Sequence, residues 1–97
     1  MDRKYVIIQI VNFVNELLKE QGIDEKIDEY SALVGGDSIL DSMGLVSLCI
    51  FLEDTSGDND FEFDWTSDAA MSKSRSMFRS AEALAEEFIK QADDQKK

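Results

Sequence analysis

The sequence contains no histidine and no proline, and Cys49 is its single cysteine. Without histidine, serine–histidine hydrolysis and histidine-ligated metal sites are excluded, because both need an imidazole. One cysteine can form neither an internal disulfide nor a cysteine-based zinc site. The absence of proline, with only five glycines and little alternation of β-branched residues, favours helices.

The whole chain has a net charge of −11, and basic residues are scarce in its middle part. Between Glu20 and Asp68, fourteen acidic residues accompany one base, Lys26. Such a field repels nucleic acid and anionic membranes and steers basic protein partners toward this region. Solubility alone is the alternative interpretation of the acidity.

A chain of 97 residues with 43% hydrophobic residues is predicted to fold as one domain with a modest core and no deep cleft. We expect a single domain over residues 1–92 and a frayed tail over 93–97. The apolar start of the chain carries polar residues at helical intervals, which favours an amphipathic helix over a signal peptide or a membrane span. We therefore expect a cytoplasmic monomer without membrane insertion.

The apolar spacing predicts a first helix from about Asp2 to Glu20, ended by Gly22 as the C-cap. About twenty residues without a sustained period follow, which predicts a long loop. Four hydrophobic residues are expected to fix this loop to the core: Ile27, Tyr30, Leu33 and Val34.

The second half of the chain predicts two further regular helices and an irregular region between them. A helix is expected from Ser42 to about Glu53, followed by a turn over 55–60. Residues 61–65 alternate aromatic and acidic residues, the period of an extended segment. A short third helix, capped by Thr66 or Ser67, is expected next, and Ser80 caps a good last helix.

The second helix has two apolar stripes, although one is enough to join a small bundle. At 100° per residue, a core-facing stripe contains Leu45, Leu48, Cys49 and Leu52. A second strip on another side contains Met43, Val46 and Ile50. Either the loop or the 61–65 segment covers this strip, or it is a docking surface for a partner.

Ser42 stands at the start of this helix, where a serine ordinarily caps free backbone N–H groups. Asp41 could do the capping instead, leaving the Ser42 hydroxyl free for covalent modification. A phosphate on Ser42 would lie at the positive end of the helix dipole. Gly44 is expected to keep the surface beside the serine bare.

The stretch LDSMGLVSLCIFLE, residues 40–53, resembles the attachment motif of acyl carrier proteins, the phosphopantetheine-carrier family. The resemblance lies in Asp41-Ser42, the apolar residue directly after it and apolar positions recurring to Glu53. The order of predicted helices extends it over nearly the whole chain. Measured from Ser38, the same template would put Ser42 and Gly44 at apolar positions, so Ser42 is the expected attachment serine.

This resemblance implies an all-α four-helix bundle that catalyses nothing itself. A phosphopantetheinyl transferase would move 4′-phosphopantetheine from coenzyme A to Ser42, and the resulting thiol would hold acyl groups as thioesters. Asp41 would help to position the transferase's metal and substrate. Partners would be acyl-transferring or acyl-modifying enzymes of lipid, fatty-acid or polyketide-type synthesis. The implied docking residues are Met43, Val46 and Ile50, with Asp37, Glu53 and Asp54 meeting basic rims.

The sequence departs from many fatty-acid carriers, which have acids where Gly44 and Ser47 stand. It is closer to specialised carriers and is also similar to the D-alanyl carriers of teichoic-acid modification. Residues 66–80 bring three bases where housekeeping carriers are often shorter and acidic. A dedicated partner enzyme is expected to recognise that difference.

Two non-carrier hypotheses remain open. A calcium-binding module would use Asp58, Asp60, Glu62 and Asp64, but Phe63 and Ala69 replace the glycine and glutamate that an EF-hand loop needs. A non-carrier adaptor would keep the second apolar strip and need no modified serine. Cys49 is interpreted as a small buried hydrophobe, since no histidine is present to activate it.

Overall fold

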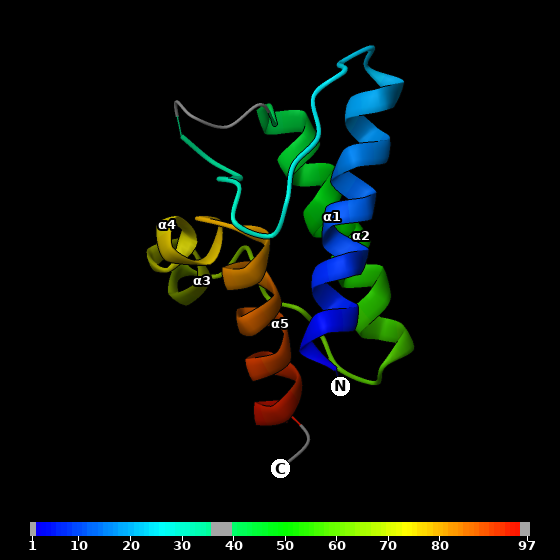
Figure 1. Ribbon diagram of the computed structural model, residues 1–97. Coiled ribbons are helices and arrows are strands. Elements are labelled where there is room, and N and C mark those ends of the chain that lie inside the picture. The colour runs from blue at the N-terminus through cyan, green and yellow to red at the C-terminus, as the bar shows by residue number, and fades with distance from the viewer. Residues whose placement is uncertain (1, 36–39, 96–97) are drawn as a thin grey trace.

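The computed structural model describes residues 2–35 and 40–95, and within them every regular element is a helix (Figure 1). Its radius of gyration of 12.8 Å is close to that of a compact domain of this length. The prediction of an all-α fold is confirmed for these residues. The helices are α1 (Arg3–Glu20), α2 (Ser42–Asp58), α3 (Asp68–Ser72), α4 (Ser74–Met77) and α5 (Ala81–Gln95).

Helix α1 begins and ends where its sequence predicts. The Asp2 side chain accepts a hydrogen bond from the Lys4 backbone N–H at 3.1 Å, and Gly22 follows the C-cap with a φ of 76°. That left-handed conformation favours glycine and stops the helix. One stripe of α1 is buried and consists of Val6, Ile7, Ile10, Val14 and Leu18.

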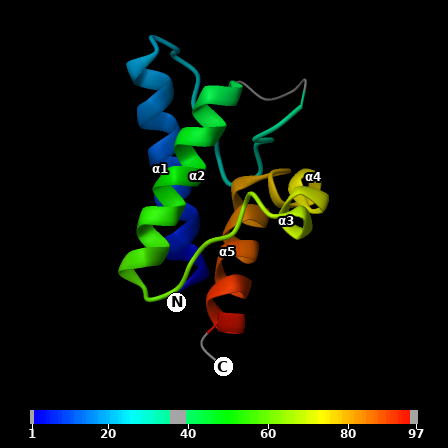
Figure 2. The same ribbon diagram turned by 180° about the vertical axis from the view of Figure 1, so that it is seen from behind.

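Helix α1 packs against both α2 and α5 and runs antiparallel to each (Figures 1 and 2). The rings of Phe13 and Phe51 stack between α1 and α2 with centroids 4.5 Å apart. The two chain termini lie at one end of the molecule, and the first turn of α2 lies at the other (Figure 1). The candidate serine is therefore remote from both termini.

Hydrogen bonds hold the long loop between α1 and α2 against α1, α5 and Phe78, the residue after α4. The Asn15 side chain in α1 pairs with both backbone groups of Ile27, at 2.8 and 3.3 Å. The Glu82 N–H of α5 donates to the Glu29 carbonyl at 3.0 Å. The Leu33 N–H donates to Phe78 O, also at 3.0 Å.

The hydrophobic residues of this loop do not all reach the core. Ile27 and Leu33 are buried and Val34 is half-buried, as predicted. Tyr30 is 70% exposed, so its assignment to the core was wrong. The cause is a local turn in which the Asp28 carboxylate accepts from the Tyr30 N–H at 2.9 Å, and this turn leaves the ring in solvent.

Helix α2 continues to Asp58, five residues beyond the predicted end at Glu53. The buried Ser56 hydroxyl donates to the Glu53 carbonyl at 2.7 Å and accepts from the Phe63 N–H at 3.0 Å. The Thr55 hydroxyl donates to the Phe51 carbonyl at 2.9 Å. These contacts satisfy polar groups that would otherwise favour a turn, and they override the turn-forming composition.

The segment after α2 crosses the molecule between α2 and α5 (Figure 2). Phe61 and Phe63 are buried against Phe88 of α5, with ring centroids 4.9 and 5.4 Å from the Phe88 ring, whereas Glu62 is exposed. The alternation predicted for residues 61–65 is present from Phe61 to Phe63, whereas Asp64 and Trp65 are both half-buried. Side-chain amides of α5, rather than a neighbouring strand, pair with its backbone.

The region expected to hold one short helix contains two. The Ser67 hydroxyl caps α3 by accepting from the Ala70 N–H at 3.2 Å, as expected. Lys73 then ends α3 and precedes α4, with a φ of −97° and a ψ of −1°. The Lys73 N–H donates to the Ala70 carbonyl at 3.1 Å, and this bond to the residue three positions earlier tightens the last turn and interrupts the helix.

Ser80 caps α5, accepting from the Ala83 N–H at 3.1 Å, as predicted. The helix continues to Gln95, so residues 93–95 are helical rather than part of a frayed tail. The Gln95 side chain donates to the Glu62 carbonyl at 2.7 Å and accepts from the Glu62 N–H at 2.9 Å. This tertiary contact, which composition does not reveal, holds the last turn in place.

Candidate functional site

Asp41 is the N-cap of α2, and Ser42 is the first helical residue. The Asp41 carboxylate accepts from the Gly44 N–H at 2.7 Å, and the Asp41 carbonyl accepts from the Leu45 N–H at 2.9 Å. Ser42 is exposed, and among the residues that the structure describes its hydroxyl makes no hydrogen bond. Capping is therefore done by the aspartate, and the serine hydroxyl is available for chemistry.

Gly44 is buried, which contradicts the expectation that it leaves a bare surface beside Ser42. A Cβ at Gly44 would lie 2.6 Å from the Leu40 Cδ1 and 3.1 Å from the Asp41 carboxylate. The Leu40 side chain, itself buried, fills the space that the missing side chain provides. Glycine here allows the residue before the Asp-Ser pair to pack against α2.

The two stripes of α2 have different environments. Leu48, Cys49 and Leu52 are buried, and Leu45 is half-buried. The long loop and the 61–65 segment leave the second strip exposed, with exposed fractions of 75% for Met43, 40% for Val46 and 48% for Ile50. A strip of three large apolar side chains beginning directly after Ser42 is thus open to contact.

Two acidic residues at the far end of this strip are exposed, namely Glu53 and Asp54. The Glu53 carboxylate accepts a hydrogen bond from the Trp65 indole N–H. The sequence did not predict this contact, because it joins residues twelve positions apart that no shared pattern connects. The third expected acid, Asp37, lies outside the described residues, as does Ser38.

An apolar cavity of about 460 Å³ opens beside the strip. Val46 and Leu45, one turn after Ser42, form its α2 wall, with Cys49 deeper along the same helix. The other lining residues are Val34, Gly35, Trp65, Met71, Ser74, Arg75 and Phe78. The sequence did not predict this cavity, and its signals were Met71 and Phe78, two large apolar residues in a serine-rich segment that both line it.

Cys49 lies in the core, as interpreted from the sequence. Burial, with a smaller contribution from the Glu53 carboxylate, raises the pKa of the Cys49 thiol to about 12. The thiol is therefore protonated at neutral pH and is a poor nucleophile.

One acidic residue of the calcium hypothesis, Asp64, has another role in the structure. The Asp64 carboxylate accepts from the N–H groups of Thr66 and Ser67 and from the Ser67 hydroxyl. These hydrogen bonds, that of the hydroxyl foremost, lower the pKa of Asp64. Among the described residues, the acidic, histidine and cysteine side chains form no group of three or more that could hold a metal ion.

Comparisons with known protein families, with curated proteins and with solved structures found no match to this chain. In the described part of the chain, each helix is too short or too polar to cross a lipid bilayer. The functional assignment therefore depends on the geometry around Ser42.

Proposed function

We propose that this chain is a carrier protein whose Ser42 hydroxyl is the attachment point for 4′-phosphopantetheine. In this proposal the fold is an acyl-carrier-like four-helix bundle, with the short α3–α4 pair acting as its third helix. One observation carries the proposal. Ser42 is exposed at the start of a helix with an exposed apolar strip, and Asp41, not the Ser42 hydroxyl, caps that helix.

The position of Ser42 suits a phosphodiester. It is the first residue of a helix of 17 residues, where free backbone N–H groups and the helix dipole favour negative charge. In the transfer reaction, the serine oxygen forms a bond to the β-phosphorus of coenzyme A, the pyrophosphate P–O bond breaks and 3′,5′-ADP leaves. The hydroxyl proton passes to a base of the transferase or to water.

The attached group would supply a thiol on a long arm, on which acyl groups are held as thioesters. This chain's residues would position the group and present it, and enzymes that dock on the same face would do the chemistry. The cavity whose α2 wall begins one helical turn after Ser42 supports the proposal, because its mostly apolar lining suits an alkyl chain. Asp41 would help the transferase to place its metal, and its carboxylate lies directly beside the serine in the sequence.

The docking face would combine the exposed strip of Met43, Val46 and Ile50 with the carboxylates of Glu53 and Asp54. A basic rim on a transferase or acyl-modifying enzyme would meet the carboxylates while apolar side chains cover the strip. The exposed strip also supports the adaptor hypothesis, which differs only in leaving Ser42 unmodified. The cytoplasmic location expected from the sequence is part of this proposal.

The test is the intact mass after incubation with coenzyme A and a broad-specificity phosphopantetheinyl transferase. We expect the mass of one prosthetic group to be added to the native chain and to Ser38→Ala, and not to Ser42→Ala. No gain with several competent transferases would favour the adaptor. For a modified protein, the mass of the thioester carried in its native host would separate acyl from D-alanyl cargo.

A further inference from the structure

The apolar strip of α2 continues across the cavity onto the α3–α4 side of the molecule. Val46 of α2 and Met71 of α3 both line the cavity, and Met71 is 60% exposed. The surface beside Ser42 is therefore wider than one helix. Its far border contains Arg75 of α4, which also lines the cavity.

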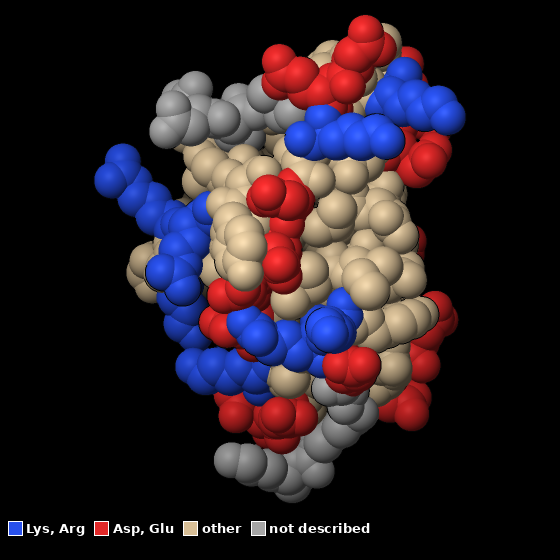
Figure 3. All heavy atoms as spheres, viewed as in Figure 1, with Lys and Arg blue, Asp and Glu red and all other residues tan. Residues whose placement is uncertain are grey.

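The two sides of this surface carry opposite charge. Glu53 and Asp54 lie on the α2 side, whereas residues 69–81 contain three bases and no acid. Lys and Arg atoms gather along the edge of the molecule that α3 and α4 occupy (Figure 3). In a chain with a net charge of −11, this edge is a local reversal of sign.

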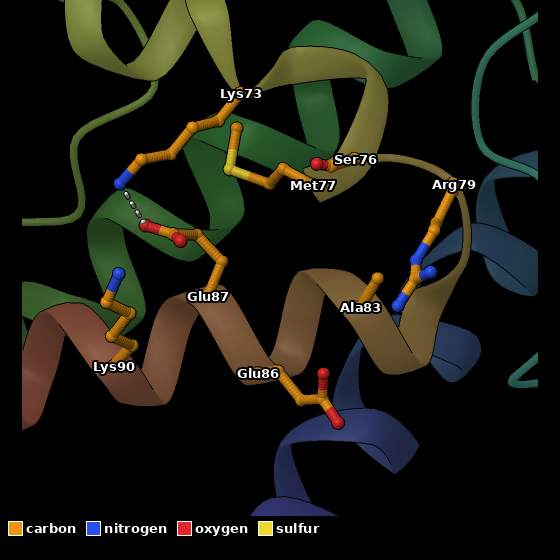
Figure 4. A pocket seen from close by; sticks show the side chains of 8 residues that line it. All are labelled: Lys73, Ser76, Met77, Arg79, Ala83, Glu86, Glu87 and Lys90. Atoms are coloured by element: carbon orange, nitrogen blue, oxygen red, sulfur yellow. Dashed lines mark ion pairs between the residues drawn. The ribbon is translucent and has the colours of Figure 1, made fainter.

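The basic residues differ in whether they have a partner within the chain. Arg3 pairs with Glu82 and Glu86, at 3.1 and 3.0 Å. Lys73 pairs with Glu87 at 3.9 Å, across a pocket between α4 and α5 (Figure 4). Within the described residues, the ion pairs include neither Arg75 nor Arg79, although both side chains are exposed (Arg79 lies on the opposite side of that pocket in Figure 4).

An unpaired guanidinium group at the border of an apolar surface, as at Arg75, is suited to bind a carboxylate of another protein. A uniformly anionic partner does not fit, because Glu53 and Asp54 on the same face would repel it. A uniformly basic partner would place its charges against Arg75 and Arg79. A second copy is disfavoured by the repulsion between two chains of net charge −11.

We propose that this face binds a partner protein of mixed charge, and the proposal deepens the carrier function and rests on it. The partner presents basic side chains to Glu53 and Asp54, apolar side chains to Val46 and Met71, and a carboxylate to Arg75. Arg79, which lines the neighbouring α4–α5 pocket, adds positive charge to the same edge of the molecule. The basic edge of α3 and α4 thereby selects a dedicated partner and rejects enzymes whose docking patch is basic throughout.

Three amphipathic helical peptides with the same leucine face test this proposal. One has a lysine row and a glutamate row beside the leucines, and the others have lysine or glutamate in both rows. We expect the native chain to bind the mixed peptide most tightly, by about fivefold over the all-lysine peptide at low salt. Reversing both arginines (Arg75→Glu with Arg79→Glu) should make the all-lysine peptide the tightest binder.

The matched control reverses two exposed bases away from this face, Lys4→Glu with Lys26→Glu, and should leave the mixed peptide preferred despite the same change in net charge. Arg75→Gln with Arg79→Gln, which introduces no repulsion, should remove the preference. A native chain that prefers the all-lysine peptide, or a preference that arginine reversal does not change, overturns the proposal. So does a dimer in sedimentation that arginine reversal dissociates, because the occupant is then a second copy.

The peptide experiment and the mass experiment fail independently. Ser42 modified as expected, with no change of peptide preference on arginine reversal, refutes the mixed-charge surface and leaves the carrier function standing. If the peptide preference switches on arginine reversal but no transferase modifies the chain, the carrier function is refuted instead. The inference that the partner is a carrier-dependent enzyme is then refuted as well.

Discussion

Gly44 and Gly57 both lie inside α2, where glycine is less favourable than alanine by roughly 0.5–1 kcal/mol. Their surroundings differ. A Cβ at Gly44 would approach the Leu40 side chain to 2.6 Å, whereas a Cβ at Gly57 would meet nothing within 4 Å. Packing against Leu40 therefore explains a glycine at position 44, and the structure offers no explanation for the glycine at position 57.

Alanine substitutions at these two glycines should have opposite effects. Gly57→Ala should raise the free energy of unfolding by about 0.5–1 kcal/mol, because the helix gains and nothing clashes. Gly44→Ala should lower it by about 1 kcal/mol, since overpacking against Leu40 outweighs the gain in helix propensity. Urea unfolding followed by circular dichroism measures both, and a stabilised Gly44→Ala would contradict the packing role.

Cys49 should make stability depend on pH under alkaline conditions. Its pKa is raised from the ordinary value of 9.0 to about 12 in the folded chain, so between these values the unfolded chain binds fewer protons than the folded one. The contribution of the protonated thiol to the free energy of unfolding is complete below pH 9 and is lost as pH rises toward 12. Over this range the free energy of unfolding falls by up to about 1.4 kcal/mol per pH unit.

Urea unfolding at several pH values above 9 checks this expectation. Cys49→Ala is the control, because it lacks the thiol while retaining every other alkaline group. The native chain should lose stability with pH more steeply than the variant, and equal slopes would show that the thiol titrates normally.

At the scale of elements, α2 shows how tertiary contacts extend a helix beyond its local signals. Residues 55–60 have the composition of a turn, yet the helix runs to Asp58 because Ser56 is buried and bonded on both sides. The same hydroxyl fixes the backbone of Phe63, so one side chain links the end of α2 to the aromatic segment that covers α5.

Removing that hydroxyl should destabilise the protein. Ser56→Ala leaves the buried N–H of Phe63 without its acceptor, and we expect a loss of about 1–3 kcal/mol in the free energy of unfolding. Ser76→Ala is the control; Ser76 is exposed, and its substitution should change stability by less than about 0.5 kcal/mol. Amide hydrogen exchange at Phe63 should rise in Ser56→Ala alone, and unchanged protection would contradict the link.

At the scale of the whole molecule, the separation of charge is the dominant feature. Most of the acids lie in the loop, α2 and the segment after it, and five more lie in α5. The unpaired arginines lie in α4 and directly after it. A net charge of −11 opposes association of separate chains. Through repulsion among its own carboxylates, it also destabilises the folded state.

Sodium chloride should therefore stabilise the isolated protein. Raising its concentration from about 0.02 to about 0.5 M shortens the screening length and should raise the free energy of unfolding by about 1 kcal/mol. Urea, which is uncharged, is the suitable denaturant. A variant with less acid, Asp24→Asn with Glu25→Gln, should gain less from the salt, and a loss of stability with salt would contradict the role of repulsion.

The sequence was sufficient for features that depend on neighbours along the chain. Helical spacing placed α1 and α5 and the two stripes of α2. Short polar side chains marked the cap at Ser80 and narrowed the cap of α3 to Thr66 or Ser67. The Asp-Ser pair at the start of α2 offered two candidate caps, Asp41 and Ser42, and the structure shows that Asp41 is the cap. Each of these needs only the periodicity of a helix and the chemistry of its ends.

Tertiary structure decided the features that join distant residues. It alone placed Tyr30 in solvent, extended α2 through Ser56, filled the space at Gly44 with Leu40 and joined Val46 to Met71 across a cavity. It also decided which bases are paired and which are left to meet a partner. The physical reason is that burial, ion pairing and cavities depend on which surfaces meet, and a local pattern fixes only the face that each element offers.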